Sequence, residues 1–281
     1  MTAVVDNPQE LQLPAIPAEL RQPAQRAEFL VNHFWDNLDF KDIASSRNQE
    51  FMEQNFATWL SLFPHAPAAA LAPAVGSFLA KAETDAQAYM LAVDLAEKYL
   101  NETESPMYSE EHYILFLEKF VESPVLGKYG SMRYQFQLRA ALKNRPGTKA
   151  ADVEFTTLKG RKSTLYATKA PQLLVLFYDN DCDHCKEVMA QLQQMPVLKR
   201  RVNDKSLTVL AVCMDGDPDQ WQDYARTLPE SWLVGLDEGK IIADESYFFR
   251  SMPSIYLLDA QKQVLMKNPA LDELEERLVK E

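Results

Sequence analysis

The sequence lacks any long hydrophobic run. No stretch of its 281 residues approaches the roughly 18 consecutive apolar residues that a membrane-spanning helix needs. The most apolar stretch, residues 66–75, is short and is interrupted by Pro67 and Pro73. Residues 1–10 also lack the basic start and apolar block of a signal peptide. We therefore predict no transmembrane segment, and the residues alone leave open a cytoplasmic protein or a processed form of an exported one.

Positive charge is scarce. The chain carries 29 Lys and Arg residues against 41 Asp and Glu residues, which gives a net charge of −12. Nucleic-acid binding depends on Lys and Arg side chains that displace counterions from phosphates. The dense basic cluster at residues 199–201 is interpreted as a solvated helix end. We predict that the protein does not bind nucleic acid.

Cysteine is rare as well, and three residues are too few for a disulfide-dense scaffold. Cys182 and Cys185 are separated by two residues, whereas Cys213 stands alone in an apolar run and is interpreted as a buried thiol. A Cys-x-x-Cys pair is also half of a zinc site, but there is no second pair, and the remaining histidines lie in the N-terminal half. We predict no metal and no organic cofactor.

Periodicity divides the chain into two domains. Residues 1–23 are rich in proline and predict an extended lead-in. Apolar residues recur at helical spacing through residues 24–143, which predicts an N-terminal all-α domain. Residues 144–281 open on a Pro-Gly turn and then alternate short apolar runs with helical patterns. This alternation predicts a C-terminal α/β domain with a central, mostly parallel sheet flanked by helices.

The elements of the C-terminal domain are predicted from its apolar runs. The expected strands are residues 153–157, 173–178, 206–214, 254–258 and 264–267. The expected helices are residues 185–202, 218–227 and 271–280. The run at 173–178 consists of large apolar residues throughout, which is typical of a strand buried on both faces.

The motif Cys182-Asp183-His184-Cys185 directly follows this buried strand and opens a predicted helix. Unpaired backbone N–H groups and the positive end of the helix dipole favour a thiolate at such a position. Two intervening residues in a helical turn let the second sulfur reach the first, so the pair can close as a disulfide and reopen by exchange. We predict that Cys182 is the attacking nucleophile and that Cys185 is the resolving thiol.

Charged neighbours are expected to tune the thiolate of Cys182. An imidazole N–H of His184 close to the sulfur would stabilise the thiolate. The negative charges of Asp179, Asp181 and Asp183 would disfavour it. We therefore expect His184, Asp183 and Asp181 to set the reactivity of the motif, with some carboxylates capping the helix instead.

A second signal lies at Met252-Pro253, directly before the predicted strand 254–258. A proline that begins a strand after an irregular segment is a position where a cis peptide bond is used. Such a proline could face the dithiol and leave the backbone of Met252 available to pair with an extended substrate. We predict that Met252 and Pro253 form the substrate-binding platform.

The C-terminal region resembles a thioredoxin-fold domain of the TlpA/ResA type. The resemblance rests on residues 173–178, the motif at 182–185 and residues 252–259. It implies a mixed central sheet flanked by helices, and a thiol–disulfide oxidoreductase that exchanges disulfides with protein substrates and with a redox partner. The chain departs from thioredoxins in having Leu176 in place of a buried acid and Asp181 in place of a tryptophan.

Residues 24–143 resemble a helical family of unknown function that precedes thioredoxin-like domains in bacterial cell-envelope proteins. Residues 27–36 and 105–107 carry this resemblance. It implies a location in the periplasm or cell envelope, with any lipid anchor outside the given sequence, and a helical domain that could mediate oligomer contacts. The alternative is a protein-interaction module in which the thioredoxin-like half is a scaffold with little redox activity.

Overall fold

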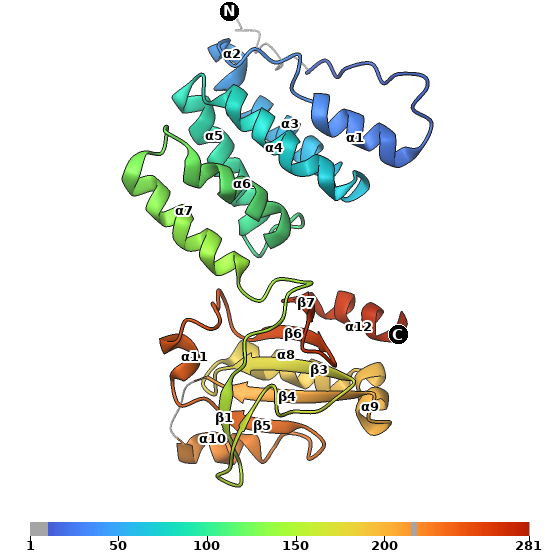
Figure 1. Ribbon diagram of the computed structural model, residues 1–281, viewed down its shortest axis with the longest axis vertical. Helices are drawn as coiled ribbons and strands as arrows, with labels where there is room; N and C mark the ends of the chain where they lie inside the picture. Colours follow the sequence, from blue (N-terminus) through green and yellow to red (C-terminus); the bar gives the residue numbers. More distant parts are fainter. Residues whose placement is uncertain (1–10, 215–217, 281) are drawn as a thin grey trace, which may run out of the picture. The chain divides into compact units, whose positions relative to one another are not determined.

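The computed structural model describes residues 11–214 and 218–280. It comprises two compact units, residues 1–139 and 140–281 (Figure 1). Within the described residues, none of the helices has both the length and the hydrophobicity that crossing a bilayer requires.

The first unit is helical. Its helices are α1 (Pro23–His33), α2 (Ile43–Ser46), α3 (Gln49–Leu60), α4 (Ala68–Ala82), α5 (Ala86–Ala96), α6 (Glu110–Glu122) and α7 (Gly127–Leu142), with a short 3-10 turn η1 (Phe63–His65) and a π-helical turn η2 (Glu97–Asn101). Side chains that accept backbone N–H groups begin several of these helices, among them Asp85 at α5 and Ser109 at α6. These caps explain why the helical pattern restarts after each loop.

Aromatic side chains fill the core of the helical unit. The rings of Trp35, Trp59 and Phe78 contact one another: the centroid of Trp59 lies 5.8 Å from that of Trp35 and 5.0 Å from that of Phe78, which are 4.8 Å apart. Its indole N–H donates to the carbonyl of Val31 at 2.9 Å, so the buried polar atom of this side chain is satisfied. These contacts tie α1, α3 and α4 into one core.

The second unit is built on a sheet that has seven strands in the described part of the chain, in the order β2-β1-β5-β4-β3-β6-β7. The strands are β1 (Glu154–Thr157), β2 (Lys162–Thr164), β3 (Gln172–Tyr178), β4 (Leu207–Cys213), β5 (Leu233–Leu236), β6 (Ser254–Asp259) and β7 (Val264–Lys267). Strands β3, β4 and β5 run parallel, whereas β1, β2, β6 and β7 pair antiparallel. Of the six strand pairings in the described part of the chain, four are antiparallel, so the sheet is mixed and the mostly parallel sheet predicted from the periodicity is wrong.

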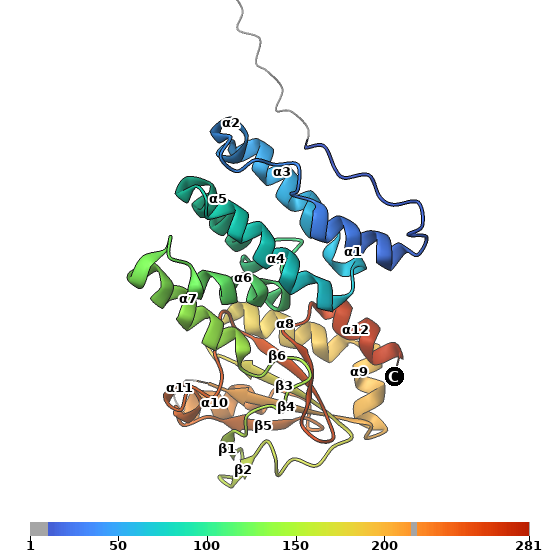
Figure 2. The same ribbon diagram turned by 45° about the horizontal axis from the view of Figure 1, so that its top comes forward.

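Helices cover the sheet. They are α8 (Asp183–Gln194), α9 (Pro196–Asn203), α10 (Pro218–Ala225), α11 (Lys240–Ala243) and α12 (Leu271–Lys280). Residues of α8, α9, α10 and α12 share one apolar cluster with one face of the sheet, whereas α11 contributes to the cluster on the other face. Helices α8, α9 and α12 lie close together (Figure 2). Strand β3 is buried on both faces, as its uniformly apolar sequence predicted.

In the second unit, one predicted helix is divided, and the short elements β2, β5 and α11 were not predicted. The helix expected over residues 185–202 is divided into α8 and α9, because Pro196 lacks the N–H that a continuous helix needs and Met195 adopts an extended conformation with ψ of 114°. Strand β5 was not predicted. It is only four residues long and contains Gly235, where an added Cβ would lie 2.4 Å from Cδ2 of Phe155. This glycine is required by close packing against β1.

Candidate active site

Cys182 lies where β3 gives way to α8. The strand ends at Tyr178, and the backbone N–H of Cys182 donates to the carbonyl of Asp179 at 3.3 Å. Cys182 is the N-cap of α8, and its Sγ accepts the backbone N–H of Cys185 at 3.1 Å. The sulfur therefore occupies the position that a capping oxygen usually takes, where an N–H group and the helix dipole stabilise negative charge.

Cys185 has a different environment from Cys182. Cys182 is partly exposed, whereas Cys185 is 1% exposed and packs into the core under α8. Burial raises the pKa of Cys185 to about 12; a backbone hydrogen bond from Asp179 opposes this shift, whereas Cys182 and the Asp179 carboxylate add to it. The two sulfurs are not joined in a disulfide. At neutral pH, Cys185 is thus a protonated thiol beneath an accessible sulfur.

The Met252-Pro253 segment lies beside this sulfur. Its peptide bond is cis, and the carbonyl oxygen of Met252 is 3.9 Å from Sγ of Cys182. Strand β6 begins directly afterwards at Ser254, which pairs with Phe177 near the end of β3. Cys182, Cys185 and Met252 therefore converge at one end of the sheet, although 70 positions separate Cys182 from Met252.

The side chains expected to tune the thiolate point elsewhere. His184 and Asp183 have side chains that are 69% and 95% exposed. His184 Nδ1 lies 3.9 Å from a carboxylate oxygen of Glu187, and Asp183 lies 3.6 Å from the ammonium of Lys186. Asp181 is also exposed. The structure brings the two cysteines together with Met252, but the described contacts of these charged residues run along α8.

Behind Cys185 lies an aromatic cluster that the sequence analysis did not identify. The indole N–H of Trp221 donates to the hydroxyl of Tyr178 at 3.2 Å, and the hydroxyl of Tyr224 donates to Sδ of Met189 at 3.8 Å. Burial, with smaller contributions from Cys185 and Cys213, raises the pKa of Tyr224. The spacing of Trp221 and Tyr224 on one predicted helix was the available signal. Their contact with the dithiol region depends on tertiary packing.

Two further positions were singled out from the sequence. Leu176, which stands where thioredoxins place an acid, is fully buried, so this position supplies no proton acceptor. Cys213 is also fully buried and pairs across the sheet with Tyr178. Within residues 11–214 and 218–280, no group of three or more His, Cys, Asp or Glu side chains is arranged to hold a metal ion.

Known proteins resemble the chain along its whole length. A family model described as "Domain of unknown function (DUF5106)" matches residues 1–144. A crystal structure of a thioredoxin-like protein from Bacteroides caccae is 34% identical, with a TM-score of 0.90 over 97% of this chain and 99% of that one. The thioredoxin-like protein YneN of Bacillus subtilis is 28% identical over 138 residues, which are 48% of this chain and 78% of YneN.

These similarities confirm the predicted fold classes, an all-helical N-terminal region followed by a thioredoxin fold with a mixed sheet. The chain belongs to the family described as Domain of unknown function (DUF5106), and its C-terminal half is a thioredoxin-like domain.

Proposed function

We propose that the protein exchanges disulfides with protein substrates through Cys182 and Cys185. The observation that carries this proposal is the asymmetry of the pair. The sulfur of Cys182 is partly exposed and receives an N–H hydrogen bond, whereas the thiol of Cys185 is buried with a pKa raised to about 12. An accessible nucleophile above a protonated resolving thiol is the arrangement that stepwise exchange needs.

The reaction proceeds in two displacements. The thiolate of Cys182 attacks one sulfur of a substrate disulfide, so that a Cys182–substrate bond forms, the substrate S–S bond breaks, and the other substrate sulfur leaves as a thiolate that takes up a proton. Cys185 then loses its proton and its sulfur attacks Cys182. The Cys182–Cys185 bond forms, the second substrate thiolate leaves and is protonated, and the substrate has gained two electrons. The reverse sequence oxidises a substrate dithiol.

Met252 supports the first displacement. Its carbonyl oxygen lies 3.9 Å from the nucleophilic sulfur. A substrate segment joined to Cys182 must therefore pass along the Met252-Pro253 backbone, where an extended chain can donate an N–H to that carbonyl. We assign Met252 and Pro253 to substrate binding. We assign His184, Asp183 and Asp181 a through-space effect on the thiolate, because they lie within three residues of Cys182 in the chain and no described contact joins their side chains to its sulfur.

The cellular setting is part of the same proposal. Both relatives named above are bacterial proteins. We place the activity in the cell envelope, where disulfides persist, with an unidentified redox partner that returns the dithiol to its starting state. The helical domain would then select substrates or mediate oligomer contacts.

Trapping of the mixed disulfide tests the proposal. Replacement of Cys185 with Ser should leave Cys182 able to attack a substrate disulfide but should remove the thiol that resolves the product, so that a reductant-sensitive mixed disulfide with disulfide-bonded insulin accumulates. The Cys182→Ser variant should give no adduct, and Cys213→Ala should behave as the native chain does. If Cys185→Ser forms no adduct and the native chain does not reduce insulin, the protein is an interaction module rather than an oxidoreductase.

The direction of exchange is measured by equilibrating the dithiol with glutathione. A reduction potential near that of thioredoxin would make the protein a reductant, whereas a much higher potential would make it an oxidant or isomerase.

A further inference from the structure

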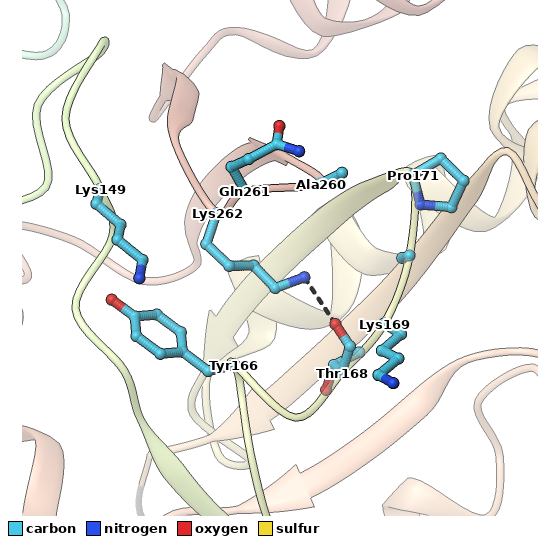
Figure 3. Close-up of a pocket in the computed structure, with 9 residues that line it drawn as sticks. Lys149, Tyr166, Thr168, Lys169, Pro171, Ala260, Gln261 and Lys262 are labelled. Atoms are coloured by element: carbon cyan, nitrogen blue, oxygen red, sulfur yellow. Dashed lines mark hydrogen bonds between the residues drawn. The ribbon is translucent and has the colours of Figure 1, made fainter.

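A second hollow of the thioredoxin-like unit lies at the far end of β3 from the dithiol (Figure 3). Gln172, the first residue of β3, pairs with Asp259, the last residue of β6. The segment before β3 and the segment after β6 therefore meet at this end of the two strands. The lining residues are Lys149, Tyr166, Thr168, Lys169, Ala170, Pro171, Ala260, Gln261 and Lys262. Because β3 spans seven residues, roughly 20 Å separates this hollow from the site at Cys182.

Lys262 is the unusual residue of the hollow. It is only 6% exposed, and its ammonium group donates to the carbonyl oxygen of Thr168 at 2.7 Å (Figure 3). An ammonium has three N–H donors, and this carbonyl satisfies one of them. Burial lowers the pKa of Lys262, with a partial offset from the charge of Asp259. The carboxylate of Asp259 is itself engaged by two backbone N–H groups of the turn.

The backbone at Lys262 adds a second cost. Its φ of 67° lies in the left-handed region that favours glycine or asparagine. A lysine at this position therefore destabilises the folded state in two ways, through its backbone conformation and through the burial of its charge. No ion pair among the described residues compensates for either effect. A ligand that supplies negative charge would account for keeping the ammonium here.

Two more ammonium groups line the same hollow. Nζ of Lys149 lies 4.2 Å from the ring centroid of Tyr166, whose hydroxyl donates to the carbonyl of Ala150 at 2.7 Å. Lys169 is the third, and it lies on the exposed segment that leads to β3. No carboxylate is among the lining residues of this hollow, and in the described part of the chain neither of these two lysines has an ion-pair partner.

Several other lysines of the same unit form ion pairs with carboxylates. Lys162 lies 3.4 Å from a carboxylate oxygen of Glu154 and 3.7 Å from one of Glu238, and Lys240 also pairs with Glu154. In a chain of net charge −12, a hollow lined by three lysines and by no carboxylate is a local exception. Such a concentration attracts anions from solution.

We propose that the hollow formed by Lys149, Lys169 and Lys262 binds a phosphate group. The three lysines that line the hollow lie on three separate segments, and point-charge donors suit the several oxygens of a phosphate, whereas a carboxylate is matched best by the planar fork of arginine. The donors would be an N–H of Lys262 that is not given to Thr168 and the ammonium groups of Lys149 and Lys169, and that of Lys149 would turn from the ring of Tyr166 to the phosphate.

The test compares the native full-length chain with Lys262→Met, using inorganic phosphate as the probe at constant ionic strength. Calorimetric titration should show phosphate binding to the native chain and at least about a tenfold loss of affinity in the variant. Thermal unfolding should show that phosphate raises the midpoint of the native chain only. Without phosphate, Lys262→Met should unfold at a temperature equal to or higher than that of the native chain, because the variant no longer buries a charge.

The matched control is Lys162→Met, which removes the same charge from the same unit but from an ion-paired, 59% exposed side chain. It should keep the native affinity for phosphate. The assignment is overturned if the native chain does not bind, if Lys262→Met binds as well as the native chain, if both variants lose affinity equally, or if acetate binds as tightly as phosphate. The dithiol assays above are independent of each of these outcomes.

Discussion

The raised pKa of Cys185 makes a quantitative prediction about its reactivity. In the Cys182→Ser variant, Cys185 is the remaining cysteine of the pair; the smaller contribution of Cys182 to its raised pKa is lost, but burial, the main cause of the shift to about 12, is retained. At pH 7 a thiol with that pKa is ionised in about one molecule in 10⁵, whereas an ordinary thiol with a pKa of about 8.5 is ionised in roughly 3% of molecules. The thiolate fraction of Cys185 at pH 7 should therefore be about 3,000-fold smaller than that of an ordinary thiol.

Alkylation by iodoacetamide measures this population, because the thiolate is the reacting species. The rate at Cys185, followed by mass spectrometry of the modified peptide, should rise about tenfold for each pH unit across the range in which the protein stays folded. The matched control is Cys185→Ser, in which the partly exposed Cys182 should be alkylated much faster at neutral pH. Cys213, which is fully buried, serves as an internal measure of unfolding.

The reasoning is refuted if the alkylation rate of Cys185 levels off below about pH 9, since the thiol would then have an ordinary pKa. Equal rates at Cys182 and Cys185 near neutrality would also contradict it, because the proposed division into nucleophile and resolving thiol rests on their different burial.

Three further outcomes are expected. Asp179→Asn removes a negative charge that raises the pKa of Cys185, so alkylation of Cys185 at fixed pH should become a few-fold faster. Gly235→Ala places a Cβ 2.4 Å from Phe155 and should lower the free energy of unfolding by about 1–3 kcal/mol in a denaturant titration. Burial lowers the pKa of His112 below its unfolded value near 6.5. The unfolded state therefore binds more protons, and the helical unit should lose stability as the pH falls from 6.5 through the lowered pKa, which thermal melts at pH 7 and pH 5 would show.

Each of these has a matched control. Asp223→Asn removes an exposed carboxylate on α10 and should leave the alkylation rate unchanged. Gly76→Ala, where the added Cβ meets only the end of a lysine side chain at 3.6 Å, should stabilise α4 by about 0.5–1 kcal/mol. His112→Phe should reduce the loss of stability at pH 5, whereas replacement of the exposed His65 with Gln should not. A loss of equal size in both histidine variants would show that His112 is not its source.

The sequence predicted the two fold classes because their signals are local. A few neighbouring residues are enough to indicate the helix starts at Asp85 and Ser109. The same holds for the buried strand β3, whose residues 173–178 are uniformly apolar. The Cys-x-x-Cys motif is local in the same sense, because the strand before it and the helix after it fix where Cys182 stands. The break at Pro196 followed from the same kind of signal, and the rule that proline interrupts a helix would have found it.

Other features depend on contacts between distant segments. Nothing local marks Gly235 as the residue that allows β1 to approach β5, and nothing near Trp221 shows that its indole meets Tyr178. The burial of Lys262 likewise follows from the pairing of Gln172 with Asp259. Periodicity and spacing carry no information about such pairings, so these sites become visible only when the sheet is assembled.

The pairing of Phe177 with Ser254 has a consequence for how the chain tolerates change. Because β3 and β6 are adjacent and antiparallel, the residues after Phe177 and those before Ser254 leave the sheet at the same end of the two strands. The inter-strand hydrogen bonds fix the distance between these two segments. The connection between β5 and β6 could therefore lengthen or shorten through insertions and deletions while the sulfur of Cys182 and the carbonyl of Met252 kept their spacing. A slip of a single residue between the two strands, by contrast, would displace one partner by about 3.3 Å and reverse its facing.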